Sequence, residues 1–298
     1  MSQCGSPSYA EDFIQPFIMH GRRSVLGEWP WQGSLHDDDV QGLHICGVTY
    51  IGGNWALTSA HCVEVPGLYW VAFGTIFPEE FGVQSQRIDV ARVYTHADYT
   101  SSLREGSDIA LLELLYPPNI DKYTRPVCLA DEESLTEVLN ESNEASCYVT
   151  GYGRQETTLY DEARVGLVPR SVCEEIFQTL TATIDHVADD AICVDHREPL
   201  SPICSGDSGG PLVCKSKTGV FRQFGVASWG LEGCNQFNPS VLVSVSYHRQ
   251  WIQSVTASPS EGNGNKSVAG GFGVSMTTTI LEMLHVDDGS HSQGYLYE

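Results

Sequence analysis

Short runs of apolar residues, broken by turn residues, cover most of this chain. From about residue 29 to residue 250, β-branched and aromatic residues occur in runs that end at Gly, Pro or Asn. Four such runs are 44–51 (HICGVTYI), 69–73 (YWVAF), 88–94 (IDVARVY) and 224–229 (FGVASW). Runs of this length and composition, separated by turn signals, predict β-strands. The pattern therefore predicts an all-β barrel or sandwich.

Two segments show helical features instead. Ser171 and Glu174 form a capping-box pattern ahead of apolar residues, which predicts the start of a helix. Near the end of the patterned region, Tyr247, Trp251 and Val255 recur at a spacing of four, which places them on one apolar helix face. We interpret Trp251 as a core anchor rather than a binding residue.

The composition changes at both ends of the chain. Residues 1–17 are rich in turn residues and lack periodicity, whereas residues 258–273 are rich in Gly, Ser and Asn, as in flexible linkers. The segment 274–286 could be part of a disordered tail or a short amphipathic docking helix. A polar end disfavours a lipid anchor, and no apolar run reaches the ~18–20 residues of a membrane span. We predict boundaries of 1–17, 18–255 and 256–298, the last being a flexible C-terminal tail.

The net charge of −22 restricts the partners that the chain can bind. Nucleic acid and anionic membranes both need a basic face, so neither is expected. We interpret the acidic residues as a solvated surface rather than a functional patch. A hydrophobic content of 41% over 298 residues is enough for the core of one large β domain or two smaller ones.

Ten cysteines, an even number, indicate disulfides and an oxidising compartment. A zinc site is the alternative, but the chain has no Cys-x-x-Cys pair. Residues 1–4 lack the basic and apolar parts of a signal peptide, so either the true start is missing or the chain is a piece of a longer precursor. Asn140 and Asn265 begin N-glycosylation sequons and are acceptors if the chain is secreted.

Three motifs carry the candidate chemistry, in the order His, Asp, Ser. The segments 58–62 (TSAHC), 107–112 (SDIALL) and 206–211 (GDSGGP) contain His61, Asp108 and Ser208. A serine hydroxyl is a poor nucleophile until a base lies beside it, and that base needs a carboxylate to fix its tautomer. Together the motifs resemble those of the trypsin/chymotrypsin family of serine proteases, over about residues 18–255.

The resemblance implies a fold and a set of catalytic roles. The expected fold is all-β, with two orthogonal six-stranded antiparallel β-barrels, a C-terminal helix and the site in the cleft between the barrels. Ser208 would be the nucleophile, His61 the general base and then acid, and Asp108 the orienting carboxylate. The N–H groups of Gly206 and Ser208 would form the oxyanion hole, where glycine permits an unusual turn.

The resemblance also implies how the cysteines pair. The expected disulfides are Cys46–Cys62, Cys147–Cys214, Cys173–Cys193, Cys204–Cys234 and Cys4–Cys128. The last would tether residues 1–17 as a propeptide. Thr75 follows Gly74 where the family's calcium loop usually has a glutamate, so we expect no metal there, and no cofactor.

The expected substrate pocket departs from the trypsin pattern. Pro202, followed by Ile203, stands where trypsin-like enzymes place the aspartate that pairs with a buried Lys or Arg. Without it a buried cation would be costly, so we expect cleavage after apolar residues. Ser240 would narrow the pocket, and Ser228, Trp229 and Gly230 resemble the strand that pairs with an extended substrate backbone. An ordinary core strand is the alternative for that segment.

Activation is the second departure. The resemblance implies that cleavage frees the ammonium group of Ile18, which then pairs with Asp207 and orders the pocket. Phe17 precedes this bond where the family usually has Arg or Lys. Ser34 and His44 match residues that hold the aspartate away in some uncut zymogens.

We therefore expect a secreted, monomeric serine endopeptidase made as a zymogen. Its partners would be protein or peptide substrates, an activating protease and a protein inhibitor. The alternative is a catalytically silent protease homologue that acts as a binding or regulatory module. Phe17, the unusual pocket and the extra tail favour that alternative, whereas the complete set of motifs opposes it.

Overall fold

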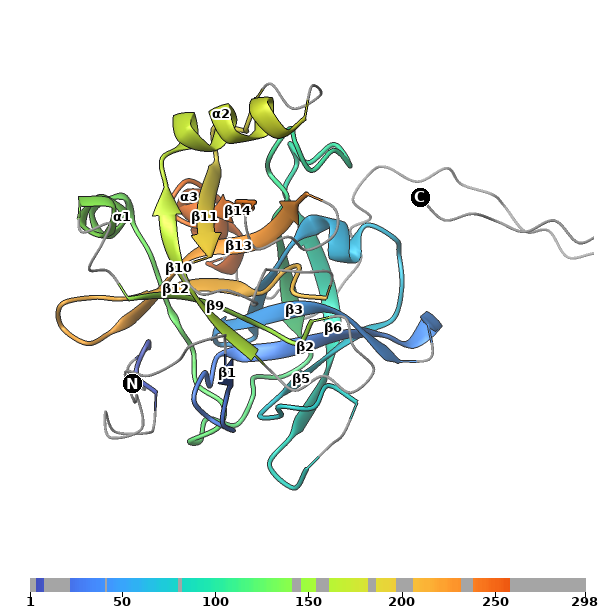
Figure 1. The fold of residues 1–298 in the computed structure, drawn as a ribbon. Helices are drawn as coiled ribbons and strands as arrows, with labels where there is room; N and C mark the ends of the chain where they lie inside the picture. Colours follow the sequence, from blue (N-terminus) through green and yellow to red (C-terminus); the bar gives the residue numbers. More distant parts are fainter. Residues whose placement is uncertain are drawn as a thin grey trace, which may run out of the picture. The chain divides into compact units, whose positions relative to one another are not determined.

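The computed structural model describes residues 4–7, 22–40, 42–79, 82–140, 146–153, 161–181, 186–196, 206–231 and 238–257. These residues form two β-barrels with short helices around them (Figure 1). The predicted fold of two six-stranded antiparallel barrels with a C-terminal helix is confirmed.

Six antiparallel strands close the first barrel in the order β2-β3-β4-β7-β6-β5. The strands are β2 (Gln32–Asp37), β3 (Leu43–Gly52), β4 (Trp55–Thr58), β5 (Tyr69–Phe73), β6 (Gln86–Thr95) and β7 (Ala110–Leu114). Strands β5 and β7 are buried along their whole length. Aromatic residues and Val71 make up most of β5, and leucines make up most of β7, so both strands supply apolar side chains to the core. Three of the four apolar runs form β3, β5 and β6.

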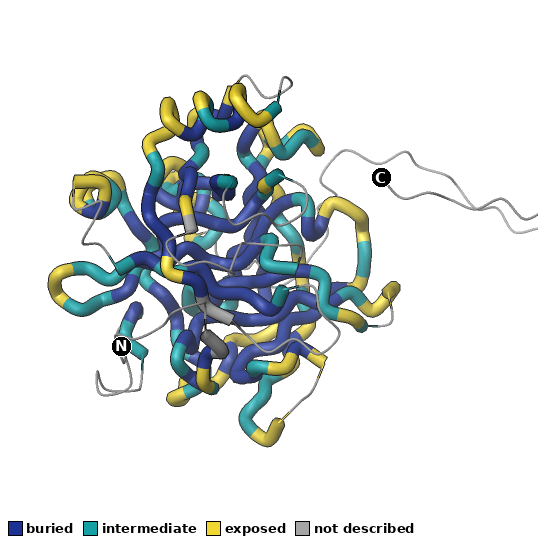
Figure 2. Tube along the Cα trace, viewed as in Figure 1, coloured by how far each residue is buried: buried dark blue, intermediate teal, exposed yellow. Residues whose placement is uncertain are grey.

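The second barrel closes in the order β9-β10-β11-β14-β13-β12. Its strands are β9 (Cys147–Gly151), β10 (Asp161–Val168), β11 (Ala191–His196), β12 (Pro211–Lys215), β13 (Phe221–Gly230) and β14 (Ser240–Ser244). Two short strands join this sheet: β1 (Arg22–Arg23) pairs with β10, and β8 (Cys128–Leu129) pairs with β13. In Figure 2 the strands of both barrels are mostly dark blue, so the buried core follows them.

A shared apolar cluster joins the barrels. Leu57 and Leu111 of the first barrel pack with Val226 and Val243 of the second, and all are almost fully buried. Helix α3 (Arg249–Thr256) adds Ile252, which is 1% exposed. The residues that flank this cluster on each barrel are consequently held at fixed positions relative to one another.

Helices α1 and α2 differ from the sequence predictions. Helix α2 (Arg170–Leu180) covers one side of the second barrel (Figure 1), but Ser171 lies inside it and no side chain caps its start after Pro169. The capping-box prediction was therefore wrong, and the Glu174 carboxylate instead accepts the Val187 N–H at 3.2 Å. Helix α1 (Glu132–Asn140) was not predicted at all.

In helix α3 the predicted apolar face is present only in part. Trp251 and Val255 pack on the shared cluster, as expected of core anchors. Tyr247 precedes the helix and is 60% exposed, so it does not belong to the buried face. Two 3-10 turns complete the described elements, η2 (Asp38–Val40) and η3 (Ala60–Val63).

Four of the five expected disulfides are present: Cys4–Cys128, Cys46–Cys62, Cys147–Cys214 and Cys173–Cys193. Cys204 and Cys234 lie outside the described residues. Two backbone hydrogen bonds reinforce the first bridge, since Gly5 N donates to Pro126 O and Phe221 N donates to Gly5 O, both at 2.9 Å. Within the described part of the chain, no helix is long and apolar enough to cross a membrane.

Candidate active site

His61 and Asp108 form the centre of the candidate site. The short turn η3 follows strand β4 and carries His61, whereas Asp108 lies just before strand β7. Strands β4 and β7 are paired, which brings the two residues close together. His61 Nδ1 donates to Asp108 Oδ2 and His61 N donates to Oδ1, both at 2.8 Å. Asp108 is fully buried, and the His61 side chain is 22% exposed. Because Nδ1–H donates to the carboxylate, the neutral imidazole carries no proton on Nε2. Nε2 is therefore the ring nitrogen that can act as a base.

A third donor reaches the same carboxylate from the second barrel. Ser228 Oγ, on β13, donates to Asp108 Oδ2 at 2.5 Å. Because a buried carboxylate without partners would be costly, these three donors explain how Asp108 is accommodated in the core. Sequence reasoning assigned Ser228 only to the substrate-binding strand and missed this hydrogen bond.

The turn that carries Ser208 is packed against the first barrel. Gly206 and Gly209 have φ values of +95° and +79°, which L-residues with side chains rarely adopt. A Cβ on Gly209 would lie 2.2 Å from Thr58 Oγ1, and the Ser208 carbonyl accepts the Gly47 N–H at 2.7 Å. The absence of side chains at Gly206 and Gly209 therefore allows the Ser208 turn to pack closely against Gly47 and Thr58 of the first barrel.

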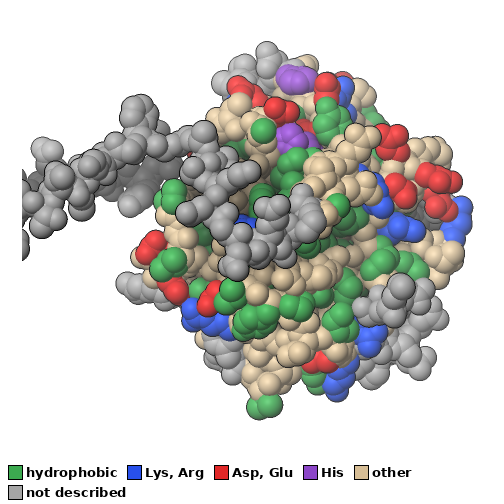
Figure 3. Space-filling model, turned by 180° about the vertical axis from the view of Figure 1, so that it is seen from behind, with side chains coloured by type: hydrophobic (Ala, Val, Ile, Leu, Met, Phe, Trp, Pro, Cys, Tyr) green, Lys and Arg blue, Asp and Glu red, His purple; other side chains and the backbone are tan. Residues whose placement is uncertain are grey.

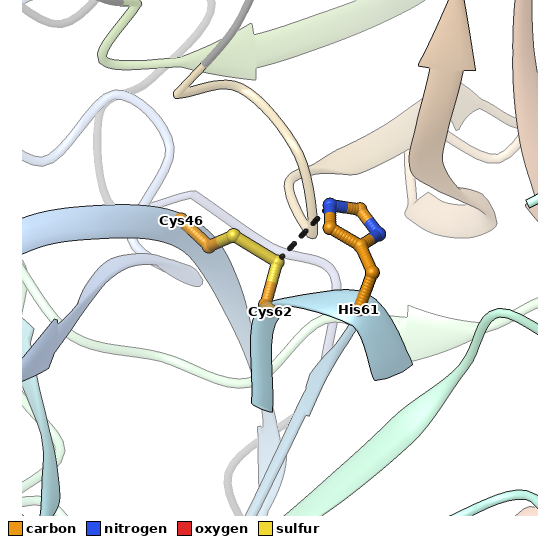
Figure 4. A group of neighbouring side chains, drawn as sticks. All are labelled: Cys46, His61 and Cys62. Carbon is orange, nitrogen blue, oxygen red and sulfur yellow. Dashed lines mark hydrogen bonds between the residues drawn. A yellow bond between two sulfur atoms is a disulfide. The ribbon is translucent and has the colours of Figure 1, made fainter. Parts of the chain in front are cut away.

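Within the described residues, no hydrogen bond joins Ser208 Oγ to His61 Nε2. His61 Nε2 lies 3.6 Å from Cys62 Sγ instead (Figure 4). Catalytic hydrogen bonds in substrate-free enzymes are often long or misaligned and tighten when substrate binds. Cys46, His61 and Cys62 are close enough to hold a metal ion, but both sulfurs belong to one disulfide and offer no thiolate ligand.

Asp207 contacts the end of strand β9 and the loop that follows it. Its Oδ1 accepts the Gly153 N–H at 2.8 Å, and a Cβ on Gly151 would lie only 2.0 Å from that oxygen. His44 Nε2 donates to the carbonyl oxygen of Gly206 at 3.0 Å. The expectation for an uncut chain, in which Ser34 and His44 hold the aspartate, therefore differs from the arrangement in this structure.

His44 ends a chain of buried polar side chains behind the Ser208 turn. Ser34 Oγ lies 2.7 Å from both His44 Nδ1 and His36 Nε2, and His36 Nδ1 donates to Gly42 O at 2.9 Å. Burial lowers the pKa of His36 to about 4, and burial also lowers the pKa of His44. The chain ties the carbonyl of Gly206 to the first barrel.

The predicted pocket residues are only partly described. Gly230 and Ser240 are paired across β13 and β14, and a Cβ on Gly230 would lie 3.8 Å from Ser240 Oγ. Trp229 packs against Phe177 of α2, with ring centroids 5.2 Å apart. Pro202, Ile203, Phe17, Ile18 and Asn265 lie outside the described residues.

Acidic side chains reach the surface of the molecule. On the face shown in Figure 3, Asp and Glu side chains occur in several separate places among polar and apolar side chains. Asn140 is exposed at the end of α1. A saccharide on Asn140 would therefore extend into solvent.

Comparisons with known proteins agree with this geometry. The family model described as Trypsin matches residues 18–252. Testisin from Homo sapiens is 34% identical over an alignment of 258 residues, and the match covers 80% of this chain and 78% of that protein. The family match spans the two barrels and all three motifs.

Proposed function

Because the chain belongs to the trypsin family of serine proteases, we propose that it is a secreted endopeptidase that uses Ser208, His61 and Asp108. The observation that carries the proposal is the His61–Asp108 pair, in which a fully buried carboxylate accepts two hydrogen bonds of 2.8 Å. It lies beside the tightly packed turn that presents Ser208. This arrangement provides a base with a fixed tautomer next to a candidate nucleophile.

The proposed reaction proceeds through an acyl-enzyme. His61 Nε2 takes the proton of Ser208 Oγ as the oxygen attacks the scissile carbonyl, and the same proton then passes to the leaving amine. Asp108 keeps Nδ1–H in place and balances the charge of the imidazolium. The N–H groups of Gly206 and Ser208 stabilise the developing oxyanion, and loss of one such donor typically costs about 2.7–4 kcal/mol. A water molecule, deprotonated by His61, then attacks the acyl-enzyme, and the proton passes to Ser208 Oγ as the carboxylic acid product leaves.

Three variants test the assignment. Ser208→Ala, His61→Ala and Asp108→Asn should each remove most hydrolysis of an ester or peptide substrate. Because the three residues act as a unit, combining two substitutions should cost little more than one. Full turnover by Ser208→Ala would refute the mechanism, as would losses that simply multiply.

We propose that the specificity pocket accepts apolar side chains. The support is Pro202 and Ile203 in place of a charged floor, together with Ser240 facing Gly230 at the mouth. A peptide library should therefore show Phe, Leu or Met before the scissile bond. A profile dominated by Lys or Arg would contradict this assignment.

We propose activation by cleavage between Phe17 and Ile18. The support is that Asp207 accepts a hydrogen bond from Gly153 N, in the loop after β9, while His44 donates to the carbonyl oxygen of Gly206 rather than holding the aspartate. The Cys4–Cys128 bridge would keep residues 1–17 attached after the cut. N-terminal sequencing of reduced, active enzyme should find Ile18 as a new terminus. Finding Ser24 instead, or full activity from uncut chain, would exclude this activation route.

A non-catalytic binding role is the second candidate. The 3.6 Å contact of His61 Nε2 with Cys62 Sγ, in place of a hydrogen bond with Ser208 among the described residues, is the observation that favours it. A protease homologue of this kind would bind peptides without cleaving them. Failure to react with a fluorophosphonate after proteolytic activation would support this role.

A further inference from the structure

A second His–Asp pair lies behind the candidate active site. Asp190 precedes strand β11, and His248 directly precedes helix α3. His248 Nε2 donates to Asp190 Oδ2 at 2.7 Å, and the two residues are 3% and 5% exposed. No motif of the sequence includes either residue, and the proposed reaction does not use them.

The same carboxylate oxygen holds the backbone next to Asp108. Ser107 N donates to Asp190 Oδ2 at 2.7 Å. The loop therefore donates a hydrogen bond to the second barrel at the position directly before the candidate catalytic carboxylate. Asp108 itself receives its second-barrel contact from Ser228, so two separate contacts cross between the barrels here.

The loop at this point adopts a conformation that needs external support. Ser107 has a φ of +56°, and the preceding Gly106 has a φ of +87°. A non-glycine residue in the left-handed region persists only when its surroundings stabilise it. A Cβ on Gly106 would lie 2.4 Å from Asp190 Oδ1, so the loop is bent closely around the Asp190 carboxylate.

Asp190 is charged and His248 is tightly packed, and both properties allow the pair to hold the loop before Asp108 rigidly. Burial raises the pKa of Asp190, but the hydrogen bonds from His248 and Ser107 outweigh it, and the pKa lies below its ordinary value. Asp190 is therefore a carboxylate that accepts from both donors. The His248 ring packs against His96 at a centroid distance of 4.7 Å, and His96 packs against Trp251 at 5.0 Å.

We propose that Asp190 and His248 are positioning residues for the reaction, which hold Asp108 in place through Ser107. The proposal rests on the proposed role of Asp108 as the carboxylate that orients His61. It assigns to the second barrel a function in placing a catalytic residue of the first barrel, separate from the Ser228 hydroxyl. A small displacement of Asp108 would misalign His61 without changing the substrate pocket.

Two variants of His248 separate positioning from packing. His248→Phe keeps a ring but removes the N–H donor, whereas His248→Gln keeps an N–H donor at similar reach. We expect His248→Phe to lower kcat by roughly 10- to 100-fold, since a misplacement of about 1 Å has effects of this size, with KM changed less than about twofold. His248→Gln should recover most of kcat. Asp189→Ala, on the exposed neighbouring carboxylate, serves as the control and should leave both parameters unchanged.

A direct readout does not depend on turnover. The downfield proton resonance of His61 Nδ1–H reports the bond to Asp108 in each variant. It should shift or broaden in His248→Phe and in Asp190→Ala, and it should recover in His248→Gln. If the wild-type protein is inactive but the resonance responds in this way, the positioning role stands and the proposed function fails.

The opposite pattern would overturn the positioning role. Wild-type enzyme that turns over substrate, together with unchanged kcat and an unchanged His61 resonance in folded His248→Phe, would show that the pair does not hold Asp108. Equal losses in His248→Phe and His248→Gln would also overturn it, because the hydrogen bond would then not be the cause. Should His248→Phe not fold, Asp190→Ala provides the decision: it removes the acceptor of both hydrogen bonds, so kcat should fall and the His61 resonance should shift, and wild-type values of both in a folded protein would contradict the proposal.

Discussion

Replacing Gly151 with alanine would test whether the position of Asp207 controls the Ser208 turn. Gly151 ends strand β9, and the added Cβ would lie 2.0 Å from Asp207 Oδ1 and 2.8 Å from its carboxyl carbon. Ordinary contacts begin at 3.4 Å, so the carboxylate would have to move by about 1.4 Å. The hydrogen bond from Gly153 N to Asp207 Oδ1, now 2.8 Å, would be lost or strained.

The expected effect on activity is larger than the effect on folding. Asp207 lies between Gly206 and Ser208, so its displacement moves the proposed oxyanion donors and the nucleophile. A misplacement of about 1 Å corresponds to roughly a 100-fold loss in kcat/KM, or about 2.7 kcal/mol. Overpacking at one site typically costs about 1–3 kcal/mol of stability, which the domain should tolerate.

The assay compares kcat/KM on an ester substrate with the melting temperature of each variant. Gly82→Ala is the control, because its Cβ would meet only the movable end of the Gln84 side chain. That variant should match wild type in both measurements. Wild-type kcat/KM in a folded Gly151→Ala protein would refute the reasoning, since Asp207 would then not control the turn.

Three further predictions follow from individual contacts. Ser228→Ala removes a hydrogen bond to a buried carboxylate, worth about 1.5–3 kcal/mol, so kcat should fall at least about tenfold in steady-state assays; an unchanged kcat would show that the other two donors suffice. The folded-state pKa of His36 lies near 4, below its ordinary value of 6.5, so its contribution to stability is fully present above pH 6.5 and is lost as the pH falls toward 4. Urea unfolding should show this loss, up to about 3 kcal/mol, and His36→Gln should reduce it; an equal pH dependence in both proteins would contradict the assignment. Reduction of activated enzyme should release a fragment containing Cys4, and a single band would indicate an uncut chain.

The fold could be predicted because its signals are local. The runs at 44–51, 69–73, 88–94 and 224–229 lie in strands β3, β5, β6 and β13, since β-branched and aromatic residues suit a buried pleated surface. Strand order and barrel closure came from the family resemblance rather than from these runs.

The helix predictions show where local patterns are insufficient. A capping-box pattern does not by itself fix where a helix starts, since Ser171 lies two residues after Pro169, inside a helix that begins at Arg170. The exposed position of Tyr247 likewise depends on where α3 begins, at Arg249. Helix α1 has only one buried residue, Val138, which gave too weak a periodic signal to predict it.

Some residues of the candidate site could likewise be predicted from local motifs, whereas others could not. His61, Asp108 and Ser208 stand in distinctive motifs, so the sequence identified them, and the structure pairs the first two directly. Asp190 and His248 carry no local signal, because their role depends on contacts across 58 to 83 positions of sequence. Only the folded chain brings Asp190 to Ser107.

The most direct test of the proposed function is covalent labelling of Ser208. Proteolytically activated wild-type protein, Ser208→Ala and Asp108→Asn would each be treated with a fluorophosphonate and mapped by mass spectrometry. We predict one adduct per chain, on Ser208, in the wild type, with no adduct in Ser208→Ala and much slower labelling of Asp108→Asn. An activated, folded wild-type protein that remains unlabelled, or one labelled at another serine, would contradict the claim that Ser208 is the nucleophile of a serine protease.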